Sequence, residues 1–168
     1  MNNDGANQLF ESIHPQYSNF VKICEQIIDD LIVEANDDLR KYEFRVAYNP
    51  EYEFEEDDVW IAAINYDAQT DFHEMLVVFN LKKLYDFLWN EGLEHDRTEI
   101  TAQLKVSLWH EIAHGLILYL SESGYDVPFE YDDEDICEEY GKYKARQWTG
   151  QNGSKLAKWL KKFDKQLS

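Results

Sequence analysis

The sequence has few of the residues that interrupt or cross-link a chain. Its 168 residues include 2 cysteines, 3 prolines and 7 glycines. Cys24 and Cys137 form neither a CxxC pair nor a dense disulfide framework, so we expect two buried thiols. No repeat and no glycine- or serine-rich linker divides the chain. We therefore expect one domain over residues 1–168, with its core at about 44–148.

Long apolar runs and basic residues are also scarce. No stretch approaches the roughly 18 apolar residues that span a bilayer, and the first residues do not resemble a signal peptide. These features predict a cytoplasmic protein without a membrane partner. The 34 acidic residues outnumber the 16 basic ones and give a net charge of -18. A field of this sign repels nucleic acids, so we expect no direct nucleic-acid binding.

What the sequence does contain is enough apolar material for a packed interior, with 44% hydrophobic and 15% aromatic residues. Apolar residues recur at helical spacing in five segments, and β-branched and aromatic residues gather in three short ones. The expected helices are 16–42, 81–91, a long central helix, 134–148 and 155–167, and the expected strands are 44–48, 59–66 and 75–79. The central helix should follow an N-cap at Thr98 and end at the stretch 121–124. This pattern predicts an α+β fold in which a small, mainly antiparallel sheet packs on a long central helix. An N-terminal helical region (1–43) and a basic amphipathic helix (154–168) flank this core.

The central helix carries an HExxH sequence, His110-Glu111-Ile112-Ala113-His114. Residues four apart lie one turn apart on the same helical face, so both imidazoles can face one metal ion. Imidazole nitrogen is a preferred ligand of Zn²⁺, and Glu111 is placed to act as the general base on a water molecule. The structural alternative is that the two histidines are satisfied polar residues beside a core helix.

Zinc needs a third protein ligand, and one helix cannot supply it. Ile117 and Leu120 stand where a metzincin pattern requires glycine and histidine, so that class is excluded. The other three histidines precede the motif, and a carboxylate from the next helix is the better candidate. In that helix Ile136 and Cys137 can face the core while an adjacent glutamate faces the metal.

The motif and the elements around it resemble gluzincin peptidases, in which HExxH is followed by a glutamate on the next helix. They look most like the short zincins of phages and mobile elements and the ImmA/IrrE-type peptidases. The resemblance covers roughly residues 45–148. It implies a zincin-like fold, with His110, His114 and Glu138 as zinc ligands and Glu111 as the base, because Glu138 precedes the small residue Gly141 by three. Glu139 and Glu134 remain alternatives for the third ligand.

A peptidase with this motif also needs groups that hold its substrate. Zincins commonly bind an extended peptide along an edge strand, for which residues 75–79 and 59–66 are the two candidates. Tyr140 or Tyr143 could stabilise the oxyanion. The acidic surface favours a basic peptide or a regulatory protein with a basic loop as substrate.

Two other functions remain open. A non-catalytic, phage-type inhibitor could use its carboxylates to imitate the charge of DNA, with the runs 51–58 and 132–135 presenting the charge. A third possibility is that the metal has a structural role while the surface binds a partner.

Charge is divided unevenly along the chain: residues 142–168 carry a net charge of +7 and residues 1–141 carry -25. We expect the C-terminal helix to pack Trp159, Leu160 and Phe163 on the domain while its lysines meet the acidic surface.

Overall fold

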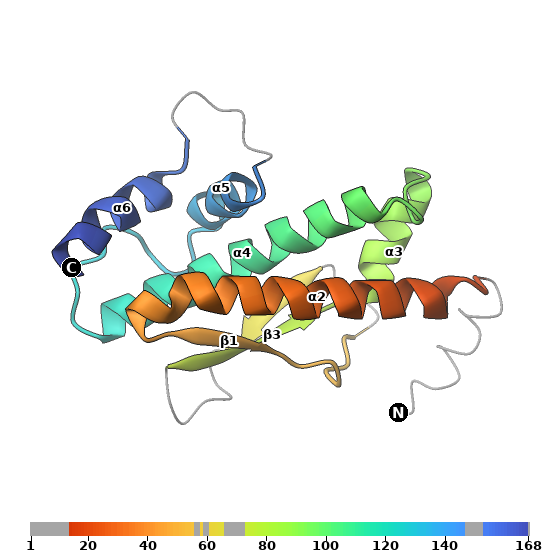
Figure 1. The fold of residues 1–168 in the computed structure, drawn as a ribbon, viewed down its shortest axis with the longest axis horizontal. Helices are drawn as coiled ribbons and strands as arrows, with labels where there is room; N and C mark the ends of the chain where they lie inside the picture. Colours follow the sequence, from red (N-terminus) through yellow and green to blue (C-terminus); the bar gives the residue numbers. More distant parts are fainter. Residues whose placement is uncertain (1–13, 56–57, 59–60, 66–72, 147–152, 168) are drawn as a thin grey trace.

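The fold is α+β, as the sequence predicts. It is described by a computed structural model for residues 14–55, 58, 61–65, 73–146 and 153–167. Within these residues, five α-helices and a 3₁₀ turn accompany three strands (Figure 1). Their order is α2 (Tyr17–Leu39), η1 (Arg40–Tyr42), β1 (Arg45–Tyr48), β2 (Ala62–Asn65), β3 (Glu74–Phe79), α3 (Leu81–Asn90), α4 (Arg97–Glu122), α5 (Glu134–Lys144) and α6 (Lys155–Leu167).

The sheet is mixed, so the expectation of a mainly antiparallel sheet is wrong. Its strand order is β1-β3-β2, with β1 parallel and β2 antiparallel to β3. Arg45 is in register with Glu74 across the first pair, and Ala62 with Phe79 across the second. The chain leaves β1, passes to the far edge to form β2, and returns through the middle as β3. Strand-like segments separated by turn residues predict sequential hairpins, and they do not reveal that one strand is skipped.

The position of β3 excludes one of the two candidate substrate-binding strands. Residues 75–79 lie in the central strand, whose backbone pairs on both sides, so they cannot receive an added strand. The second candidate, residues 59–66, contains β2, which lies at an edge of the sheet. Residues 59, 60 and 66 are outside the described part of the chain.

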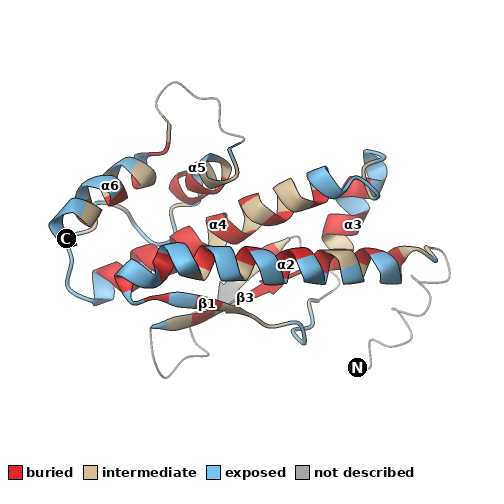
Figure 2. Cartoon of the chain, in the orientation of Figure 1, coloured by how far each residue is buried: buried red, intermediate tan, exposed pale blue. Residues whose placement is uncertain are grey.

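Two long helices cover one face of the sheet. Helix α2 contacts β1, α4 contacts β2 and β3, and the two helices contact each other (Figure 1). The apolar stripe of α4 is almost completely buried, and α2 shows a buried and an exposed side (Figure 2). Each buried leucine or isoleucine contributes about 1.5–3 kcal/mol relative to exposure, so this stripe anchors the helix firmly. Its members are Ile100, Leu104, Leu108, Ile112 and Leu116.

Aspartate side chains cap the N-terminal ends of α4 and α5, the two helices that build the site. The structure begins α4 at Arg97, with Asp96 as the N-cap accepting a hydrogen bond from the Glu99 amide, rather than at the expected cap Thr98. Aspartate is among the best N-caps, and a shift of two residues at the helix end leaves the helical face unchanged. Asp133 caps α5 in the same way through the Ile136 amide at 3.1 Å. Both cysteines are free and fully buried, as predicted.

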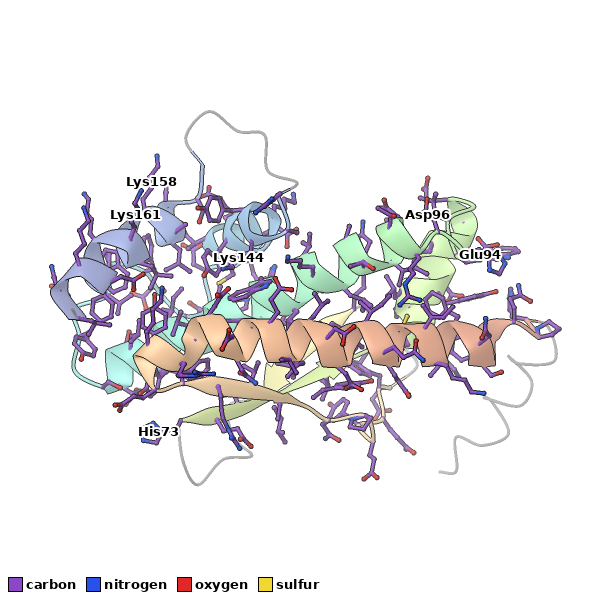
Figure 3. The ribbon with its side chains drawn as sticks, viewed as in Figure 1. His73, Glu94, Asp96, Lys144, Lys158 and Lys161 are labelled. Atoms are coloured by element: carbon purple, nitrogen blue, oxygen red, sulfur yellow. The ribbon has the colours of Figure 1, made fainter. Side chains whose placement is uncertain are left out.

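Helix α6 packs on the body through the apolar face that the sequence predicts. Leu160 and Phe163 are buried, and Trp159 stacks on Phe163 with 5.0 Å between ring centroids. An ion pair joins α6 to the turn η1, and its acid is on α6: Asp164 pairs with Lys41 at 2.8 Å. The lysines of its outer face are exposed, and Lys158 and Lys161 point away from the body (Figure 3). No described helix has the length and apolar character of a membrane-spanning segment.

Candidate metal centre

The two histidines of HExxH meet at their Nε2 atoms. His110 and His114 lie one turn apart on α4, and their Nε2 atoms are 3.1 Å apart. His114 is buried and the His110 side chain is 15% exposed. Burial of Leu108 and Ile112 fixes the rotation of α4 about its axis, so the helical face with both imidazoles is turned toward α5.

Helix α5 brings carboxylates to this pair because it crosses α4 at very short range. Gly141 lies at the crossing, where a Cβ atom added to it would be 2.6 Å from the Val106 carbonyl oxygen and 3.0 Å from the His110 amide nitrogen. Only glycine permits this approach. Ile136 and Cys137 face the core, as the sequence analysis expects.

Glu134, in the first turn of α5, completes the group around the imidazoles. One of its carboxylate oxygens lies 2.9 Å from Nε2 of His110, and the other lies 3.2 Å from Nε2 of His114. His110, His114 and Glu134 form the described cluster whose ligand atoms could share one metal ion. Glu134 is one of the two alternatives that the sequence analysis leaves open for the third ligand.

Glu138 lies on the other side of His110. Its carboxylate is 2.5 Å from Nδ1 of His110, and Lys142 lies 3.7 Å from its second oxygen. The hydrogen bond from His110 lowers the pKa of Glu138 although its partial burial opposes this. Glu139, the remaining alternative, points elsewhere and accepts a hydrogen bond from the Lys155 amide at the start of α6.

The outer nitrogen of each imidazole has an acceptor, which determines the ring tautomers. A carboxylate and a carbonyl can only accept, so Nδ1 of His110 donates to Glu138 and Nδ1 of His114 donates to the Tyr131 carbonyl. In the neutral rings both Nε2 atoms then carry lone pairs, and these two lone pairs face each other. Such an arrangement is repulsive unless a proton or a cation lies between them.

The pKa of His110 is raised. Burial alone would lower it, but the hydrogen bond to Glu138 and the charges of Glu111, Glu138 and Glu134 outweigh burial and favour the protonated ring. A cation at Nε2 satisfies the same electrostatic demand as that proton. The carboxylates around His110 therefore favour positive charge on or beside its ring.

The donor set fits zinc. Ligand bonds of about 2.0–2.1 Å in a tetrahedron place neighbouring ligand atoms roughly 3.3 Å apart. The two Nε2 atoms are 3.1 Å apart, and one ligand atom from each of the three residues lies within 4.8 Å of the others. Two imidazoles and one carboxylate leave one position open, which is typical of catalytic zinc. Ligating histidines usually donate their second N–H to a carboxylate or a carbonyl, as both do here.

The cluster opens into a cleft of about 620 Å³. Glu111 lines this cleft beside the two histidines, so the predicted base has access to it. Its lining comes from α4, from Tyr131, Asp132 and α5, and from the edge strand β2 with the residue before it. The lining residues are Ile61, Ala62, Ala63, Gln103, Val106, Ser107, His110, Glu111, His114, Tyr131, Asp132, Glu134 and Glu138.

Neither tyrosine that the sequence analysis considers for the oxyanion lines the cleft. Tyr140 is buried with its ring edge against Trp109, and Tyr143 is an exposed residue of α5. Sequence reasoning missed Tyr131 and Asp132, which lie in the cleft wall. The only sequence signal for them is their position just before the N-cap of the helix that supplies the glutamates.

Comparisons with known proteins leave the site to be judged on its own geometry. No protein-family model matches the chain, and no curated protein or solved structure matches it.

Proposed function

We propose that this protein is a zinc-dependent metallopeptidase whose metal is held by His110, His114 and Glu134. The observation that carries the proposal is the pair of imidazole Nε2 atoms that face each other beside Glu134, with each Nδ1 already bound to an acceptor. The assignment of Glu134 replaces Glu138 as the preferred third ligand. Glu138 then orients His110 and increases the electron density on its ring.

The metal ligands, Glu111, Glu138 and the Tyr131 carbonyl each have a part in the proposed peptide hydrolysis. Zinc held there would supply a Lewis acid for the scissile carbonyl and lower the pKa of a water molecule to about 7. Glu111 takes the proton from the attacking water and passes it to the leaving amine. Glu138 and the Tyr131 carbonyl hold the two rings in the tautomer that leaves both Nε2 atoms free to bind.

A peptide or protein is the substrate class that suits the shape of the site. The edge strand β2 lines the cleft together with the two histidines, so an extended chain added to this edge would run past the histidines. Ala62 and Ala63 on that side leave room for a backbone to approach. The proposal also includes a zincin-like fold, which the resemblance of the sequence to gluzincin peptidases implies.

The first test is metal content together with turnover. The protein, purified without chelators, should contain about one zinc per chain by elemental mass spectrometry, and His110→Ala should lose it. Glu111→Gln should retain zinc but lose hydrolysis of an unstructured protein such as casein, followed by mass spectrometry of the fragments. Glu130→Gln, an exposed acid outside the cleft, is the matched control and should keep both.

The same variants separate the proposal from its alternatives. If His110 is simply protonated between Glu138 and Glu134, the protein binds no zinc at neutral pH. If the protein is a non-catalytic acidic inhibitor, Glu111→Gln is silent in every assay. A protein that keeps zinc but cleaves nothing, with or without Glu111, would indicate a structural metal.

A further inference from the structure

Asp132 is an acidic side chain in the cleft wall that takes no part in the proposed metal centre. Glu134 and Glu138 contact imidazoles, and Glu111 is the proposed base. Asp132 lines the same cleft, is exposed, and has no hydrogen bond or ion pair with any described residue. Its carboxylate is therefore free to meet a group that enters the cleft.

The backbone on both sides of Asp132 is held in place. On one side, the Tyr131 carbonyl accepts the hydrogen bond from Nδ1 of His114. On the other, the Asp133 amide donates to the Glu130 carbonyl at 3.2 Å, and the Asp133 side chain caps α5. Residue 132 is thus fixed next to the metal ligands by two anchored neighbours, which is the condition for a defined subsite.

The side of the cleft formed by β2 and the residue before it is apolar, whereas α4 contributes polar side chains together with Val106. Ile61, Ala62 and Ala63 line the cleft from the side of β2, and Val106 lines it from α4. No lysine or arginine is among the described residues that line the cleft. Long cationic side chains bury their methylene stems on apolar surface while the charged head stays near water and an acid. A cleft that offers both apolar surface and the carboxylate of Asp132 fits a lysine or arginine side chain.

We propose that Asp132 forms a subsite for a lysine or arginine side chain of the substrate, close to the bond that is cleaved. This inference rests on the proposed peptidase function and narrows its substrate to peptides with a basic residue near the cleavage point. The negative charge of the whole molecule speeds the encounter with such peptides. Asp132 adds a local contact that selects which residue enters the cleft.

The test measures binding separately from turnover. Three fluorescein-labelled octapeptide pools have Lys, Gln or Glu fixed at one position and an equimolar mixture of Ala, Leu, Phe and Ser at the others. Binding of each pool to zinc-loaded Glu111→Gln protein is followed by fluorescence anisotropy. The Lys pool should bind most tightly and the Glu pool most weakly. Adding Asp132→Asn should reduce the preference for Lys over Gln by up to about fivefold, the effect of one partly exposed charge pair.

Controls distinguish the subsite from the field of the whole protein. Glu130→Gln removes the same charge from the same loop outside the cleft, and it should leave the Lys-to-Gln ratio unchanged. Equal losses in Asp132→Asn and Glu130→Gln would overturn the subsite, because the effect would then be long-range. Equal weakening of all three pools by Asp132→Asn, or loss of its zinc, would also overturn it, because Asp132 would then support the site's structure.

The failure of this inference can be told from the failure of the proposed function. If wild type contains zinc and cleaves peptides without preferring a basic residue, the subsite is wrong and the peptidase stands. If wild type contains no zinc and Glu111→Gln binds none of the pools, both are wrong.

Discussion

At the scale of single residues, the assignment of the two glutamates of α5 is the main outcome. Glu134 lies beside both Nε2 atoms, whereas Glu138 contacts only the outer nitrogen of His110. These positions imply different roles, because a ligand donates electrons to the metal and an outer carboxylate only orients and polarises a ligand. Removing each should therefore weaken metal binding to a different degree.

We predict that Glu134→Ala weakens zinc binding more than Glu138→Ala does. Loss of an outer carboxylate costs about 10- to 100-fold in metal affinity, and loss of a ligand should exceed that. Glu139→Ala, whose side chain caps α6 instead, should leave the affinity unchanged. Competition with a chromophoric chelator at neutral pH measures all three. The reverse order of Glu134 and Glu138 would restore Glu138 as the third ligand.

A second residue-scale prediction concerns the metal-free protein. The pKa of His110 is raised, so its contribution to stability is complete below the usual value of 6.5 and is lost as pH rises through the folded-state pKa. The pKa of Glu138 is lowered, so its contribution is complete above its usual value of 4.5 and is lost as pH falls. Together they stabilise the fold most between about pH 4.5 and 6.5.

Urea unfolding in the presence of a chelator tests this window. Wild type should lose free energy of unfolding between pH 6 and pH 8 relative to Glu138→Gln, in which the acceptor that raises the pKa of His110 has lost its charge. Parallel pH profiles for the two proteins would show that the pair does not titrate as inferred. Added zinc should reverse the trend for wild type, because metal binding requires the deprotonated ring.

At the scale of elements, the packing of α5 on α4 decides which glutamate reaches the Nε2 atoms of the two histidines. Glu134 and Glu138 are four residues apart and share one helical face, so their spacing alone cannot rank them. The ranking depends on where α5 crosses α4, and Gly141 sets that point. The periodicity of α4 and the HExxH motif could be recognised in the sequence because they are local. Strand order and helix crossing depend on contacts between distant segments, and periodicity carries no information about these.

We predict that Gly141→Ala destabilises the protein and weakens its metal binding. In an open helix the change would stabilise by about 0.5–1 kcal/mol, but here the new Cβ meets backbone atoms of α4. Forcing the helices apart should cost about 1–3 kcal/mol. The displacement also moves Glu134 away from the histidines. Urea unfolding and the chelator competition measure the two effects.

Tyr143→Ala is the matched control for Gly141→Ala. It changes an exposed residue of the same helix that does not line the cleft, and it should affect metal affinity little. A Gly141→Ala protein as stable as wild type, with unchanged zinc affinity, would mean that α5 can shift without loss and that the close crossing does not position Glu134.

At the scale of the whole molecule, charge is unevenly divided. Residues 1–141 carry -25 and the remainder +7, yet the ion pair that fastens α6 uses its single acid, Asp164, and Lys41 of the body. Tyr42 also donates to Asp164 at 2.6 Å. The +7 of residues 142–168 is much smaller than the -25 of residues 1–141. The acidic body is therefore left with strong self-repulsion.

We predict that salt stabilises this protein. Raising sodium chloride from about 20 mM to about 500 mM shortens the screening length and weakens repulsion among the 34 acidic residues more than it weakens attraction to the 16 basic ones. A gain of about 1 kcal/mol would raise the thermal midpoint by about 2–4 °C for a chain of this length. Calorimetry with a chelator present removes any contribution from metal. Potassium chloride at the same ionic strength should give the same shift, since screening does not depend on the cation.

A fall in the thermal midpoint would show that local ion pairs such as Lys41–Asp164 outweigh the repulsion of the whole molecule.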